Sequence, residues 1–202
     1  VEITFGCYYN QKIDKNILPE NLKVLTFKYR YNQKIEKDVL PESLEKLVFD
    51  YTSDYNHNFE KDILPKNLKV LILGEFFNQK FDKYVLPENL EELTFGYNYN
   101  QSLEKDVLPK KLKKIIFKVS PKYKCKIEQN VLPPNLKVLR LGYYYHKLEK
   151  ETLPRQLEEL YFYKGFNQSL ENDLLPKTLI KLDLGLDNNQ SIKHGIFFHE
   201  LT

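Results

Sequence analysis

The stretch YNQKIEKDVLPESLEKLVF, residues 31–49, returns with small changes along almost the whole chain. Its Leu-Pro step recurs eight times, at intervals of 21 to 24 residues. The prolines of these steps are Pro19, Pro41, Pro65, Pro87, Pro109, Pro133, Pro154 and Pro176. An aromatic residue with Asn-Gln precedes most steps, and Leu-x-x-Leu-x-Phe or a close variant follows. Repetition on this scale predicts an array of stacked units rather than a globule around one centre.

The length of the repeat indicates the fold class. A period near 22 residues is typical of leucine-rich-repeat solenoids, in which each unit contributes one strand. The sequence contains no alanine, and this argues against helix-pair repeats, which need small residues and good helix formers where helices cross. We predict a right-handed leucine-rich-repeat-like solenoid over residues 1–190. It would carry a parallel sheet of about nine short strands on its concave face and turns or 3₁₀ segments on its convex face.

Strands are expected to follow the Leu-Pro steps. Besides residues 2–6, the predicted segments are 22–28, 44–50, 68–74, 90–96, 112–118, 136–142, 157–163 and 179–185. Side chains alternate along a strand, so in the first full unit Leu25 and Phe27 should point into the core. Val24, Thr26 and Lys28 should point to the opposite face. Residues 191–202 lack the Leu-Pro step and are predicted to cap the same domain.

A recurring asparagine predicts a structural ladder on the return path. It occurs at Asn10, Asn32, Asn56, Asn78, Asn100, Asn167 and Asn189. A carboxamide both donates and accepts hydrogen bonds, so a stacked row can satisfy backbone groups that tight turns leave unpaired. Lys124 stands where this asparagine should be, and we expect it to interrupt the ladder. A ligand-binding role for the row is the alternative.

Unit lengths vary at three places. Two units are longer by two residues, and the extra residues follow the strands within 50–54 and 118–122. Insertions of this kind lie at one edge of a solenoid and often carry its function. The seventh unit is shorter by one residue near 143–146, and the sequence alone does not identify the lost position.

Charge and cysteine content narrow the class of partner and the compartment. The 31 basic and 28 acidic residues interleave and leave a net charge of +3, so a nucleic-acid partner is unlikely on this pattern. No apolar run approaches the roughly 20 residues of a membrane span, so no membrane contact is expected. Cys7 and Cys125 lie about five repeats apart, roughly 25 Å, which is too far for a disulfide. Free thiols favour a reducing, cytoplasmic compartment.

Catalytic and metal-binding patterns are weak. The four histidines are His57, His146, His194 and His199, and none has the spacing of a metalloenzyme motif. A metal pair at His194 and His199 is the alternative. The carboxylates stand beside lysines, and no acid–base pair emerges. We therefore predict a protein that is not an enzyme and that has no cofactor or metal.

A protein partner is expected on the concave face of the sheet. Its apolar members would form an exposed patch on neighbouring strands, and such patches tend to mark interaction sites. Its arginine and tyrosines are residue types enriched in interface hot spots. The predicted partner-binding residues are Val48, Val70, Ile72, Ile116, Arg140, Tyr161 and Tyr163. The simpler interpretation is that β-branched residues suit strands.

The aromatic-Asn pair, the Leu-Pro step and the period together resemble the FNIP repeat, a leucine-rich-repeat variant of social amoebae and giant viruses of amoebae. Residues 77–79 and 166–168 read Phe-Asn-Gln, and residues 31–33 and 99–101 read Tyr-Asn-Gln. The resemblance covers residues 1–190. The chain departs from the pattern at Lys124-Cys125, at His57, in the seventh unit, and in having Leu-Pro where the family has Ile-Pro.

This resemblance implies a recognition module. FNIP-repeat proteins often carry an F-box before the repeats, which implies the substrate-recognition arm of an F-box-type ubiquitin-ligase adaptor. An F-box/Skp1-type partner is expected only if such an upstream segment exists. Since the sequence begins without methionine, we expect it to be part of a longer protein. A structural or self-associating repeat protein, pairing through its uncovered first strand, is the alternative; nucleic-acid binding is the less favoured one.

Overall fold

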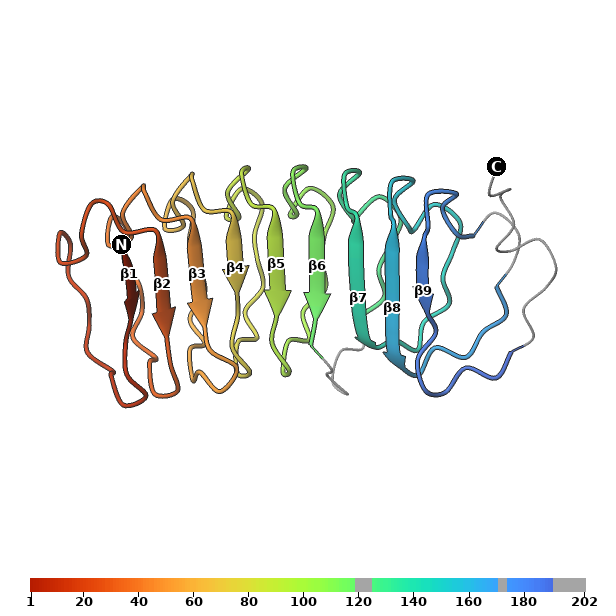
Figure 1. Cartoon of the computed structure of the whole chain (residues 1–202), viewed down its shortest axis with the longest axis horizontal. Helices are drawn as coiled ribbons and strands as arrows, with labels where there is room; N and C mark the ends of the chain where they lie inside the picture. Colours follow the sequence, from red (N-terminus) through yellow and green to blue (C-terminus); the bar gives the residue numbers. More distant parts are fainter. Residues whose placement is uncertain (119–124, 171–173, 191–202) are drawn as a thin grey trace.

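Nine strands form one parallel sheet. The computed structural model describes residues 1–118, 125–170 and 174–190. Within these residues the strands lie side by side in chain order (Figure 1). They are β1 (Glu2–Thr4), β2 (Val24–Phe27), β3 (Lys46–Phe49), β4 (Val70–Ile72), β5 (Glu92–Phe95), β6 (Lys114–Phe117), β7 (Val138–Tyr143), β8 (Glu159–Lys164) and β9 (Lys181–Asp183). The predicted solenoid, with one strand per unit, is confirmed.

Neighbouring strands pair in one register from end to end. Leu25 of β2 pairs with Leu47 of β3, which pairs with Leu71 of β4. The same position continues through Leu93 and Ile115 on β5 and β6. Because side chains alternate along each strand, this register places every inward residue beside its equivalent in the next unit. Each unit therefore buries its apolar side chains against its two neighbours.

Most strands begin two residues later than the sequence pattern predicts. In the first full unit the N–H of Leu22 donates to the carbonyl of Pro19 at 3.0 Å, and the equivalent bond recurs in all eight units. The Pro-x-x-Leu segment is thus a hydrogen-bonded turn rather than the start of a strand. Its leucine is still a core residue, since Leu22 is fully buried. Pro19 fixes φ for this turn and loses no sheet hydrogen bond there.

The predicted division between buried and outward residues is confirmed. Leu25 and Phe27 are fully buried, whereas Val24 and Thr26 are half-buried. On the return path the aromatic residues before Asn-Gln form a stacked column, with ring centres 6.1 to 6.4 Å apart. This column consists of Tyr31, Tyr55, Phe77 and Tyr99. Tyr123, the corresponding residue in the sequence of the next unit, lies outside the described residues.

The structure shows how the short seventh unit fits the array. Tyr144 is buried and occupies the place of the aromatic residue that other units have before Asn-Gln. It stands three residues after Leu141, whereas Phe166 stands four after Phe162. The turn after the strand has therefore lost the residue. β7 compensates by extending to Tyr143, which pairs with Lys164 of β8.

Irregular segments with short turns make up the described part of the return path, and it contains no α-helical or 3₁₀ segment. One turn position has a positive φ of 60 to 67° in the seven units in which it is described. Its residues are Asn16, Asp38, Asp62, Tyr84, Asp106, Asn130 and Glu151. Asparagine and aspartate tolerate this left-handed conformation better than other non-glycine residues, which explains why they predominate.

The asparagine ladder is confirmed as a structural element. Asn78 Oδ1 accepts hydrogen bonds from the backbone N–H of Asn100 at 2.8 Å and from Gln101 Nε2 at 3.1 Å. The same arrangement joins Asn10 to the following unit. Cys125 stands in the place of a glutamine, and its thiol lies 3.7 Å from the carbonyl oxygen of Asn100. The expected interruption at Lys124 lies outside the described residues, as does the predicted cap at 191–202.

We expect Phe95→Ala to lower the free energy of unfolding by about 3–5 kcal/mol, because the fully buried ring packs on both neighbouring units. Thr94→Ala is the matched control, since Thr94 lies one residue away on the open face and is only half-buried. Urea denaturation measures both. Equal losses for the two variants would contradict the assignment of inward and outward residues.

Tyr99 leads to a prediction about alkaline stability. Its hydroxyl is buried and has no hydrogen-bond partner in the described part of the chain, and burial raises its pKa well above the ordinary value. In the unfolded chain Tyr99 ionises near pH 10, so the folded state loses stability as the pH rises above 10. Tyr99→Phe should lessen this loss by about 1.4 kcal/mol per pH unit above 10.

Chemical denaturation of Tyr99→Phe and the unsubstituted protein between pH 8 and 12 measures this difference. Comparing the two cancels the contribution of lysines, which also titrate in this range. Below pH 10 the variant should be at least as stable, because an unpaired buried hydroxyl costs about 1–3 kcal/mol. Parallel stability curves above pH 10 would show that the Tyr99 hydroxyl is accessible to solvent in the folded state.

Candidate functional site

The strand register creates rows of side chains on the open face of the sheet, opposite the core. The row at the middle of the strands, here named the central row, carries one residue from each strand from β2 to β8. It runs through Thr26, Val48, Ile72, Thr94, Ile116, Arg140 and Tyr161, each paired with the next across a strand boundary. Adjacent members are thus about 4.8 Å apart along the sheet. The row forms a continuous strip perpendicular to the strands.

Five of the seven predicted partner-binding residues fall on the central row. They are Val48, Ile72, Ile116, Arg140 and Tyr161. Val70 lies two residues before Ile72 on β4, and Tyr163 lies two residues after Tyr161 on β8. Each of the seven is half-buried or exposed. The structure therefore brings these residues to one face, while their role in binding remains a prediction.

Apolar and β-branched side chains occupy the central row from β3 to β6. Val48, Ile72 and Ile116 are all half-buried, with Thr94 between the two isoleucines. Beside this part of the row, Glu92 and Lys114 form an ion pair at 3.4 Å. Exposed pairs of this kind add little stability. The apolar strip is thus bordered by a polar margin, as in many protein-binding surfaces.

A cluster of tyrosine and cations occupies the strands that follow. The guanidinium of Arg140 lies 4.4 Å from the centre of the Tyr161 ring, and the Lys181 ammonium lies 5.2 Å from it. The Tyr161 hydroxyl donates to Glu159 Oε2 at 2.5 Å. Attraction between a cation and the face of an aromatic ring holds such groups together. We name Arg140, Tyr161 and Lys181 the cationic cluster.

Two glycines, one after β4 and one after β5, are in close contact, and the sequence pattern did not reveal this. A Cβ atom at Gly96 would lie 1.8 Å from the carbonyl oxygen of Gly74, so the two backbones pack directly. On the same side of the sheet, Lys118 reaches Tyr51, which lies three units away. The Lys118 ammonium lies 4.9 Å from the Tyr51 ring. Burial lowers the pKa of Lys118 below its ordinary value.

The two insertions have different outcomes. In the first, Ser53 is fully buried and its N–H donates to the carbonyl of Asp50 at 2.9 Å, while Tyr51 is exposed. This loop therefore packs partly into the core rather than extending wholly into solvent. The second insertion lies outside the described residues apart from Lys118. The link between Lys118 and Tyr51 still joins the starts of both loops.

Several tyrosines lie outside the core. Tyr29, Tyr51, Tyr145 and Tyr163 are exposed and follow or end their strands. Tyr143 lies between two others, with ring centres 6.2 Å from Tyr145 and 5.8 Å from Tyr163. Their position after the strand, rather than before Asn-Gln, is the signal that could have identified them.

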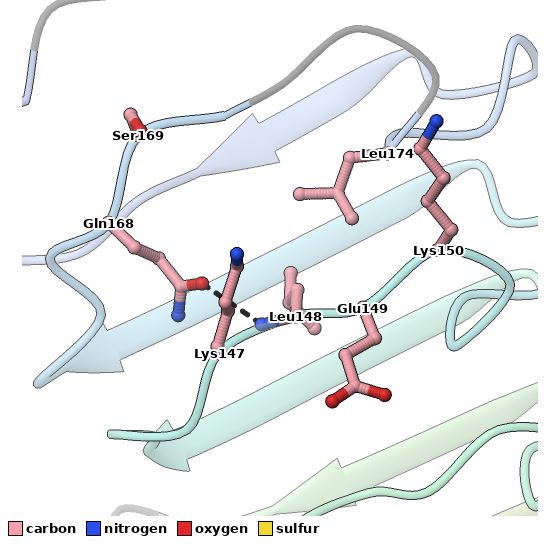
Figure 2. A pocket seen from close by; sticks show the side chains of 7 residues that line it. All are labelled: Lys147, Leu148, Glu149, Lys150, Gln168, Ser169 and Leu174. Carbon is pink, nitrogen blue, oxygen red and sulfur yellow. Dashed lines mark hydrogen bonds between the residues drawn. The ribbon is translucent and has the colours of Figure 1, made fainter.

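A small cavity lies between the return segments of the seventh and eighth units. Figure 2 shows its lining residues, with Gln168 Oε1 accepting a hydrogen bond from the Leu148 N–H at 2.9 Å. The volume of about 220 Å³ is below the roughly 300–1,000 Å³ of typical ligand pockets. The cavity is therefore a weaker candidate site than the open face.

Metal and membrane sites find no support in the part of the chain that the structure describes. No group of three or more His, Cys, Asp or Glu residues is placed there to hold an ion. These residues contain no helix that is long and apolar enough to cross a membrane. His194 and His199, the alternative metal pair, lie beyond the described residues.

Comparison with known proteins places these observations in context. A profile of the FNIP Repeat family matches residues 9–52, 55–98, 77–120, 99–144 and 144–187. No curated protein matches the sequence. A crystal structure described as CroV588, a novel circular LRR protein, is 37% identical with a TM-score of 0.84. The match covers 90% of this chain and 26% of that one.

A second solved structure, YopM from Yersinia enterocolitica, is more distant. It is 19% identical with a TM-score of 0.35, and the match covers 85% of this chain and 52% of YopM. A TM-score at this level supports no closer comparison. The present chain spans about a quarter of the length of CroV588, the solved structure that it matches well.

Proposed function

This chain belongs to the FNIP repeat family, and we propose that it is a non-enzymatic module whose open sheet face binds a protein partner. Leucine-rich-repeat solenoids are typically interaction modules, since their stacked units present extended surfaces. In a longer protein with an F-box, this face would be the substrate-recognition arm of a ubiquitin-ligase adaptor. We place that protein in the cytoplasm on the basis of its free cysteines.

The central row is the observation that carries this proposal. It joins an apolar strip, Val48 to Ile116, directly to Arg140 and Tyr161 in one unbroken register. Apolar side chains offer area to bury, and arginine and tyrosine are the residue types that most often dominate binding energy. The strip needs no rearrangement to receive a partner, because the paired strands already hold its members in place.

Self-association is the second candidate, and the free edge of β1 favours it. On one side β1 pairs with β2, whereas its other side has no partner strand among the described residues. An unpaired edge presents backbone donors and acceptors to another chain. The apolar strip and the cationic cluster lie on the face of the sheet rather than on this edge, so we favour the open face.

We expect Tyr161→Ala with Tyr163→Ala to weaken partner capture at least about tenfold, because truncation of a hot-spot tyrosine typically costs 2 kcal/mol or more. Quantitative proteomics on captured cell lysate measures the loss. The matched control is Tyr8→Ala with Tyr84→Ala, which removes two exposed tyrosines from outside the nine strands. Thermal unfolding of both double variants checks that each remains folded.

Equal capture by the two double variants and the unsubstituted protein would contradict the proposal. Sedimentation at several concentrations, made on the same samples, separates the second candidate. A mass that increases with concentration, together with unchanged capture, would favour pairing through β1 instead.

A further inference from the structure

Two cations on the open face lack acidic partners although carboxylates stand nearby. Neither Arg140 nor Lys181 forms an ion pair within the described ranges, yet Lys114 on the same face pairs with Glu92 at 3.4 Å. Glu159 and Asp183 are the carboxylates nearest to these cations in the strand register, and both take part in other hydrogen bonds. They accept hydrogen bonds from the Tyr161 hydroxyl and from the Gly185 N–H.

The cationic cluster therefore presents two exposed cations whose donor groups are not engaged in an ion pair among the described residues. Arg140 is exposed on β7 and Lys181 is exposed on β9, with the Tyr161 ring between them on β8. A guanidinium binds a carboxylate through two parallel hydrogen bonds, and a lysine ammonium donates up to three more. A carboxylate group above the Tyr161 ring would meet donors from both sides.

The cluster continues directly into the apolar strip. Arg140 pairs with Ile116 across the β6–β7 boundary, and Ile72 lies two strands further on. Three strand spacings separate Ile72 from Arg140, about 14 Å. An extended chain advances about 3.3 Å per residue, so about four residues span this distance.

From this juxtaposition we infer that the open face binds an extended acidic segment of a protein partner, with an apolar side chain on Ile72 of the Val48–Ile116 strip and a carboxylate on Arg140 and Lys181. The two groups stand three to five residues apart in the segment. This inference rests on the proposed function and adds the chemistry of the partner. The unengaged donors of Arg140 and Lys181 select the acid, and the spacing of the strands sets the distance between the two anchors.

Single-stranded nucleic acid fits the cluster less well. Bases bind to aromatic rings through free ring faces, but Arg140 and Lys181 both lie over the Tyr161 ring. The neighbouring rings do not form a parallel series either. Tyr143 is tilted by 36° from Tyr145 and by 56° from Tyr163. A carboxylate needs only the two cations, and both are exposed.

Selection from a displayed random dodecapeptide library tests the inference. The targets are the unsubstituted protein, Arg140→Glu with Lys181→Glu, and the matched control Lys28→Glu with Lys46→Glu. Lys28 and Lys46 belong to the same face, and the control makes the same change in net charge. The unsubstituted protein and the control should enrich peptides that carry Asp or Glu three to five residues from an apolar residue. The Arg140/Lys181 variant should not.

Fluorescence anisotropy on the most enriched peptide gives the magnitude. Its Kd should increase at least tenfold for the Arg140/Lys181 variant and less than twofold for the Lys28/Lys46 control. Enrichment of the same peptides by the Arg140/Lys181 variant, or of peptides without acidic residues, would overturn the inference. Circular dichroism of each variant establishes that the charge changes leave the sheet folded.

A third variant, Ile72→Ser with Ile116→Ser, separates this inference from the proposed function. If peptide binding is lost in this variant but not in the Arg140/Lys181 variant, the result would support the proposed binding face and contradict the acidic partner. No enriched peptide, or no effect of either variant, would contradict both. A labelled oligo-dT strand provides the last outcome. If the oligo-dT strand binds, its binding depends on Arg140 and Lys181, and no acidic peptides are enriched, then the cluster binds phosphate groups and the inference is overturned.

Discussion

Parallel pairing in a single register is the constraint on which this structure depends. No unit can bury its own leucines and phenylalanines, because the sheet is one layer and the return path consists of irregular segments with short turns. Burial is achieved only when Leu47 lies between Leu25 and Leu71, and so on along the sheet. Stability in such an array is approximately a sum of nearest-neighbour terms. The end units, with Ile3 and Leu182 half-buried, have one neighbour fewer among the described residues.

The same register builds the candidate site. An inward column of leucines necessarily has an outward row one residue away, since side chains alternate along each strand. Selection on the core leaves the outward residues free to differ, and they change from valine and isoleucine on β3–β6 to arginine and tyrosine on β7 and β8. The face therefore has an apolar part and a cationic part at a fixed separation. Because the apolar part and the cationic part follow one another along the solenoid, the proposed partner would bind in one orientation.

Much of this could be predicted from the repeat itself. The period identified one strand per unit, and the alternation within Leu-x-Phe identified which residues are buried. Five of seven predicted site residues lie on one row because the repeats align them. The two-residue error in strand starts arose because Pro-x-x-Leu fits a turn as well as an extended segment. Tyr144 was not assigned because a one-residue deletion shifts the pattern without showing where the chain is shortened.

Other features could not be predicted from the repeat period. Lys118 contacts Tyr51 across three units, and the repeat pattern gives no sign of a contact over this distance. The cationic cluster likewise depends on where three flexible side chains lie, not on their spacing in the chain. Lys181 was not singled out from the sequence, since its importance comes from the neighbouring Tyr161 ring. Contacts between side chains of different repeats could therefore be identified only from the structure.

Cysteine cross-linking across the central row measures the register most directly. In a chain with Cys7→Ser and Cys125→Ser, the pair Ile72→Cys and Thr94→Cys lies on adjacent strands. About 4.8 Å between their Cα atoms is within the range for a disulfide. We predict rapid intramolecular oxidation of this pair and none for Ile72→Cys with Ile116→Cys, two strands apart. Equal oxidation of both pairs, or failure of the adjacent pair, would contradict the in-register stack.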